Sequence, residues 1–158
     1  MALKDFVNRK YDYLAFQPVA DRRDGLKDLA LYDERSSGKI CTGAQKLAQR
    51  WALEFLTERG SMPYLPERGC DFMTQIRQGL VRTQNDIIAN FTSASLAITR
   101  NLRQEEYESM PDEERFDRAL LANVILYPGY ADLRVIIVSR AGIGRTVVFP
   151  IETLPQVS

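Results

Sequence analysis

Apolar residues recur at helical spacing between residues 42 and 59. They fall on one stripe, and most of the polar residues lie off it: Ala44, Leu47, Ala48, Trp51, Phe55 and Leu56. Thr42 and Gln45 have the Thr-x-x-Gln spacing of a capping box, and Gly60 follows the last residue of the pattern. The pattern therefore predicts a helix over residues 42–59 that buries Trp51 and Phe55 in the core.

A second helical region follows Gly69. Residues 71–79 predict a short helix with Asp71 as its N-cap, and Gly79 with the polar residues 83–86 predicts a break. A longer helix is expected from there to about Gln104, on the stripe Ile87, Ile88, Phe91, Ala94, Ile98 and Leu102. One bent helix over residues 71–104 is the alternative.

The pattern changes to strands from Ala119 onward. Apolar runs lie at residues 120–127, 132–140 and 145–151, separated by the turn dipeptide Pro128-Gly129 and by the connector at residues 141–144. Pro150 marks either the end of the last strand or an edge position. The expected fold is α+β: two to three helices, then a small antiparallel three-stranded meander with the helices packed on one face.

The stretch between the first two helical regions contains two prolines and two glycines. Pro63 and Pro66 keep it out of a helix and out of a sheet interior, because proline fixes φ and lacks an N–H donor. Gly60 and Gly69 stand where left-handed backbone is expected. Residues 57–72 are therefore expected to end one helix at Gly60, run extended past the two prolines and turn at Gly69 before the next helix begins.

Domain organisation is predicted as a leader over residues 1–40 and one α+β domain over residues 41–158. The leader follows no single period, yet it carries anchors such as Phe6, Tyr11 and Phe16. It is expected either to wrap over its own core or to dock on a neighbouring subunit. The amino terminus lacks the apolar run of a signal peptide, so folding in a reducing cytoplasm is expected.

Composition argues against most catalytic chemistry. The 158 residues contain 21 Lys and Arg against 21 Asp and Glu, which indicates neither a nucleic-acid partner nor a solvating acidic tail. No apolar run approaches the ~20 residues needed to span a bilayer, so no membrane partner is expected. There is no histidine, and Cys41 and Cys70 stand alone, so neither a metal site nor a nucleophile pair is expected. Gly142-Ile143-Gly144 lies between strands and is interpreted as a turn. No catalytic residue, cofactor or metal is predicted, and the protein is not expected to be an enzyme.

The predicted meander leaves two strand edges open. Such edges are covered, charged, or used to accept a strand from another chain. Val147, Val148 and Phe149 form a short apolar segment between Arg145 and Glu152. Either the leader covers this edge, or it accepts a strand from a partner.

The order of these elements resembles the baseplate wedge and sheath-initiator family of contractile-tailed phages. The family is often labelled "lysozyme-like" and has relatives in type VI secretion baseplates and contractile bacteriocins. The resemblance covers roughly residues 41–152 and is strongest at Leu56-Thr57 through Gly60, at Pro66 and Gly69, and at the helix beginning at Phe72. The family carries a Glu-Pro-Arg triplet before the first strand; this chain has Glu113-Glu114-Arg115 instead. The resemblance implies that Glu114 and Arg115 take the outer roles of the triplet, either as an ion pair or as partner contacts.

The resemblance implies a structural virion protein of the tail baseplate, assembled in the host cytoplasm. It would initiate the tail sheath by strand addition, in six copies around the tube, with the sheath protein, the wedge proteins and the tail tube or hub as partners. The expected contact residues are Glu114, Arg115, Pro66, Arg68, Val147 and Phe149. The alternatives are another small tail or secretion-system adaptor, or a peptidoglycan hydrolase built on a carboxylate pair.

Overall fold

The computed structural model describes residues 12–13 and 40–153. The described residues form three helices and then a three-stranded antiparallel sheet, which confirms the predicted α+β class. A two-residue strand β1, Asp12–Tyr13, pairs antiparallel with β2, Ile40–Cys41. The predicted leader otherwise lies outside the described residues, and so do its two expected roles.

The sheet is the expected meander, in the order β3-β4-β5. Its strands are β3, Phe116–Tyr127; β4, Tyr130–Ser139; and β5, Gly144–Glu152. Strand β3 begins three residues before the predicted Ala119, because Phe116 is buried in the core and pairs with Ser139. Pro150 lies inside β5, opposite Asp132 of the central strand β4, so it occupies an edge position and does not end the strand.

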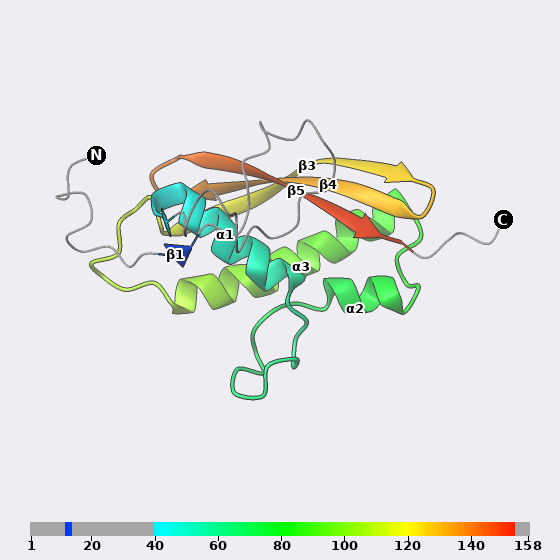
Figure 1. The fold of residues 1–158 in the computed structure, drawn as a ribbon, viewed down its shortest axis with the longest axis horizontal. Coiled ribbons are helices and arrows are strands. Elements are labelled where there is room, and N and C mark those ends of the chain that lie inside the picture. The colour runs from blue at the N-terminus through cyan, green and yellow to red at the C-terminus, as the bar shows by residue number, and fades with distance from the viewer. Residues whose placement is uncertain (1–11, 14–39, 154–158) are drawn as a thin grey trace, which may run out of the picture.

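The helices cover one face of the sheet (Figure 1). Their bounds are α1, Gly43–Leu56; α2, Phe72–Arg77; and α3, Gln84–Gln104. An aromatic cluster joins the layers: the ring centroid of Phe55 lies 4.7 Å from that of Phe72, 4.9 Å from that of Phe149 and 5.1 Å from that of Trp51. Such pairs add to the large area these rings bury, so this cluster is the centre of the fold. The predicted burial of Trp51 and Phe55 is confirmed.

The first helix differs from its prediction at both ends. Thr42 is the N-cap but makes no side-chain capping bond, so the predicted capping box is absent. The helix ends at Leu56, because the backbone of the C-cap Thr57 is extended, with φ −83° and ψ 128°. The N–H and the hydroxyl of Thr57 both donate to the carbonyl of Leu53 in the last turn. Gly60 has the expected positive φ of 79°, but it shapes the connector instead of ending the helix.

A capping box does occur, at the start of α3. The hydroxyl of Thr83 accepts from the N–H of Asp86 at 3.2 Å, and the carboxylate of Asp86 accepts from the N–H of Thr83 at 2.8 Å. The N–H of Arg82 donates to the same carboxylate, and the amides of Arg82 and then Thr83 lower the pKa of Asp86 from its ordinary value of 3.8. The break after Gly79 is therefore real, and the alternative of one bent helix over residues 71–104 is wrong. Asp71 precedes α2 as expected, without a side-chain cap bond.

Candidate functional site

The predicted contact residues lie in three separate regions. Glu114 and Arg115 belong to the link between α3 and β3, Pro66 and Arg68 to the connector between α1 and α2, and Val147 and Phe149 to β5. No ion pair or hydrogen bond among the described side chains joins one region's predicted residues to another's. The six predicted contact residues therefore do not form one continuous site.

Glu114 is turned inward and is 1% exposed. Its Oε1 accepts from the N–H of Gly43 at 3.2 Å, and its Oε2 lies 2.7 Å from Nζ of Lys46. A carboxylate at this position satisfies one of the free amides in the first turn of α1 and faces the positive end of the helix dipole. Glu114 thus takes the capping role predicted for Thr42, and its carboxylate is not available to a partner.

Arg115 is bound mainly to its own link. Its Nη2 donates to the carbonyl of Tyr107 at 3.0 Å and to that of Glu108, and its Nη1 lies 3.4 Å from Oδ1 of Asp112. Glu114 and Arg115 do not form the ion pair that could have replaced the outer members of the family's triplet, since each has other partners. The contacts of Arg115 therefore stabilise the conformation of the link between α3 and β3.

Arg68 also has partners within the chain. Its guanidinium forms ion pairs with Glu54, at 2.8 Å, and with Glu105. Pro66 is exposed, and its carbonyl accepts from the N–H of Gly60 at 3.0 Å. Both residues shape the connector, and of the two only Pro66 presents an exposed side chain.

The free edge of β5 is the remaining candidate, and its geometry follows from two hydrogen bonds. The N–H of Thr153 donates to Gly129 at 2.9 Å, and the N–H of Ser139 donates to Ile143 at 3.1 Å. In an antiparallel ladder, hydrogen-bonded and non-bonded pairs alternate. The odd-numbered residues of β5 therefore bond to β4, and the main chain of the even-numbered residues points away from the sheet: Gly144, Thr146, Val148, Pro150 and Glu152.

This parity corrects the prediction for β5. Phe149 is 3% exposed and packs on Trp51 and Phe55, and Val147 is half-buried against the same core. Their main-chain N–H and C=O groups point toward β4 and not toward an incoming strand. The main-chain groups that face such a strand belong to Gly144, Thr146 and Val148. The sequence held the signal that identifies them, because a proline tolerated within an edge strand fixes which positions face outward.

The row of outward groups on β5 is unpaired within the described part of the chain. No hydrogen bond from another described segment reaches Gly144, Thr146 or Val148. Pro150 lacks an N–H, so the row offers amide donors only up to Val148 before it is interrupted. The amino-terminal half of β5 is therefore the part of this edge that could pair with another strand.

The opposite edge, on β3, is irregular. The pairing with β4 shifts register between Phe116 and Arg118 and again between Leu121 and Asn123, so Asp117 and Ala122 have no opposite residue on β4. Bulges of this kind twist a strand and disrupt the repeat that an added strand would need. Of the two edges, β5 is the better acceptor.

Little in the described residues suggests catalysis. No group of His, Cys, Asp and Glu among them could hold a metal ion. A pocket between α2, α3 and the connector, lined by Arg59, Asp71 and Asn90 among others, has a volume of about 20 Å³, which is room for about one water molecule. Burial raises the pKa of the nearby Cys70 thiol to about 11, so this thiol is a poor nucleophile.

None of the described helices is both long enough and apolar enough to cross a membrane. The comparisons with known proteins add no relative: no family model, no curated protein and no solved structure matches the chain.

Proposed function

We propose that this protein is a non-enzymatic assembly protein whose β5 edge accepts an extended segment of another protein. The observation that carries the proposal is the row of main-chain groups on Gly144, Thr146 and Val148, with which no other segment of residues 12–13 and 40–153 pairs. Strand addition gains affinity from main-chain hydrogen bonds and specificity from alternate side chains. The proline at position 150 limits pairing to one half of the strand, which restricts the register of the added segment.

We propose further that the protein functions in a contractile tail, because residues 41–152 resemble baseplate wedge proteins. There the chain is a virion component of the baseplate, and the added segment is an extended arm of the tail sheath protein. The structural support is the α+β order of elements and the acceptor edge. The wedge proteins, and the tube or hub, are further partners under this proposal.

The test uses proline substitutions at outward positions of the two edges. Val148→Pro removes the outward donor of β5 at a position that makes no bond to β4, as Pro150 already does naturally. Leu126→Pro is the matched control, because alternation from the Tyr127–Tyr130 pair directs the main chain of Leu126 outward on β3. Circular dichroism and thermal unfolding establish that both variants are folded.

Binding to the purified sheath protein of the same tail or secretion system is then measured. We expect Val148→Pro to weaken it at least about tenfold and Leu126→Pro to leave it near the unmodified level. Added sheath protein should also protect the amides of Thr146 and Val148 from hydrogen exchange. If only Leu126→Pro lost sheath binding, the acceptor edge would be β3. If the unmodified protein and both variants bound the sheath protein equally well, strand addition would be overturned. Clearing of a cell-wall suspension would overturn the non-enzymatic assignment.

A further inference from the structure

The outward row of main-chain groups on β5 is short, and it is symmetric about Thr146. Gly144, Thr146 and Val148 each carry an N–H and a C=O group that point away from β4. The row ends on one side at Pro150, which has no N–H, and on the other side at Gly144, where the strand begins. A row with equal numbers of groups on each side of one central residue can pair with an inverted copy of itself.

We propose that the β5 edge also pairs with the β5 edge of a second copy of this chain, antiparallel and centred on Thr146. In that register Thr146 lies opposite Thr146 of the second copy, and Gly144 lies opposite Val148 of the second copy. Each such pair can exchange two main-chain hydrogen bonds, because hydrogen-bonded pairs of an antiparallel ladder bond in both directions. Pro150 lies beyond the paired residues, so every donor has an acceptor.

The neighbouring symmetric registers are less favourable than this one. A pairing centred on Val147 would place Pro150 opposite Gly144 of the second copy, where the proline ring takes the place of the donor that the glycine carbonyl needs. A pairing centred on Arg145 would leave Val148 opposite the turn that precedes the strand. Only the proposed centre pairs all three outward residues and excludes the proline, so the position of the proline selects the register.

The side chains on both faces of the sheet are compatible with this pairing. Thr146 is exposed, and two threonines directly opposite each other are a favourable cross-strand pair. Val148 is half-buried and would lie opposite a glycine, so its side chain meets no bulky neighbour. On the other face Arg145 would lie opposite Val147 of the second copy. The two arginines are therefore diagonal neighbours and do not stand directly opposite each other, where like charges destabilise a sheet.

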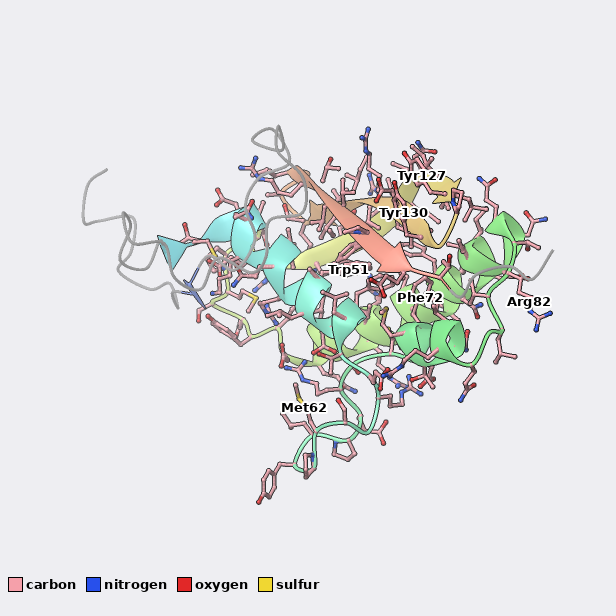
Figure 2. All side chains as sticks on the ribbon, turned by 45° about the vertical axis from the view of Figure 1, so that its right-hand side comes forward. Trp51, Met62, Phe72, Arg82, Tyr127 and Tyr130 are labelled. Carbon is pink, nitrogen blue, oxygen red and sulfur yellow. The ribbon has the colours of Figure 1, made fainter. Side chains whose placement is uncertain are left out.

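Strand β5 is fixed in the core before it pairs. The ring centroids of Trp51 on α1 and Phe149 on β5 lie 6.0 Å apart (Figure 2), and a strand that is already ordered loses less entropy on pairing. The two sheets would join into one of six strands, with the helices of both copies on the same face.

The interface is nevertheless small. It contains about five residues of each copy, against roughly 20–30 per side in a stable complex, so we expect a dissociation constant of about 10–100 µM. A dimer this weak protects the edge and still yields it to a tighter partner. Its competition with a sheath arm rests on the proposed function, whereas the dimer itself rests only on the β5 edge.

Disulfide crosslinking of the full chain under mild oxidation tests the register. Opposite residues of a hydrogen-bonded antiparallel pair have Cα atoms about 5.5 Å apart, which suits a disulfide, so Thr146→Cys should form a covalent dimer. Val148→Cys is the matched control on the same row, because the two copies of residue 148 are offset by about 13 Å along the strands. We expect Thr146→Cys to crosslink at least about tenfold faster than Val148→Cys and than the unmodified protein, whose Cys41 and Cys70 are buried. Equal rates for the two variants would overturn the register.

Sedimentation equilibrium over a range of protein concentrations measures the non-covalent dimer. We expect the average mass to rise from that of one chain toward that of two, Val148→Pro to weaken the dimer at least about tenfold, and Leu126→Pro to leave it unchanged. The proposal is overturned if the unmodified protein stays monomeric at about 0.5 mM, or if Val148→Pro dimerises as well as the unmodified protein.

Sheath binding separates this proposal from the proposed function. The oxidised Thr146→Cys dimer should not bind the purified sheath protein, and reduction should restore binding. If the sheath protein binds and no dimer forms, only the pairing with a second copy fails. If the dimer forms and the unmodified protein does not bind the sheath protein, the proposed function fails and the dimer stands. If the oxidised dimer binds the sheath protein as well as the reduced protein does, the competition for one shared edge is overturned.

Discussion

Glu114 and Lys46 form a buried ion pair, with Oε2 and Nζ 2.7 Å apart, although 68 residues of sequence separate them. The pair joins the link before β3 to the first turn of α1. Because the same carboxylate also accepts from the N–H of Gly43, it fixes where α1 begins. One buried side chain thus connects the helical layer to the entry of the sheet.

Breaking this pair should be costly, since a lone buried charge remains. We expect Lys46→Met to lower the free energy of unfolding by about 3 kcal/mol, because the Glu114 carboxyl group is then left buried without its cation. The double variant Lys46→Met with Glu114→Leu should cost clearly less than the sum of the two single changes. Urea unfolding of the four proteins measures the coupling. Additive single costs would mean that the two groups do not interact as described.

Gly69 and Gly60 give a matched pair of glycine substitutions. Both have positive φ, 82° and 79°, so alanine at either site costs about 1–2 kcal/mol from backbone strain. A Cβ at Gly69 would in addition lie 2.2 Å from the carbonyl oxygen of Thr57, whereas nothing lies within 4 Å at Gly60. Gly69→Ala should therefore destabilise the protein by at least about 2 kcal/mol more than Gly60→Ala in urea unfolding. Equal losses would contradict the close approach of these two segments.

The two threonine N-caps should respond differently to alanine. Thr83 caps α3 through its hydroxyl, so Thr83→Ala should cost about 1 kcal/mol. Thr42 precedes α1 without such a bond, so Thr42→Ala should change stability by less than about 0.5 kcal/mol. Thermal and urea unfolding of both variants check this. A large loss at Thr42 would show that its hydroxyl does cap α1.

Asp86 makes the stability of α3 depend on pH. Its pKa is lowered in the folded protein by the amides of Arg82 and Thr83, so the stability it adds is present above its unfolded pKa near 3.8. That stability is lost as the pH falls through the lower, folded-state pKa. The difference in unfolding free energy between the unmodified protein and Asp86→Asn should thus be largest near neutral pH and shrink in acid. A difference that stays constant down to about pH 2 would contradict the assigned hydrogen bonds.

Hydrophobic periodicity was enough to predict the layers of this fold. The stripe containing Trp51 and Phe55 and the end of α3 at Gln104 followed from spacing alone, and the meander followed from apolar runs separated by turn residues. The stripe was less accurate at its margins, where Leu56 and Ile88 proved exposed. Local spacing therefore predicts the centre of a buried helix face well and the residues at its margins poorly.

Features that depend on distant contacts were missed. The capping-box spacing at Thr42 was present, but the carboxylate of Glu114 arrives from far along the chain and binds the amide of Gly43 instead. Nothing local to Glu114 indicates that it is buried. The connector was expected to run extended past its prolines, but it forms hydrogen-bonded turns there: the N–H of Leu65 donates to Met62 and that of Arg68 to Leu65. The base of the connector depends in turn on Glu54, which accepts from the N–H of Gly69, and spacing does not reveal this contact.

Pro150 also limits the length of the extended segment that can pair with β5. The stretch from Gly144 to Val148 spans about five residues, or about 17 Å of extended chain. A guest peptide longer than this would meet the pyrrolidine ring and have to turn away from the sheet. Candidate partners can therefore be ranked by whether they carry a short extended run that is followed at once by a bend.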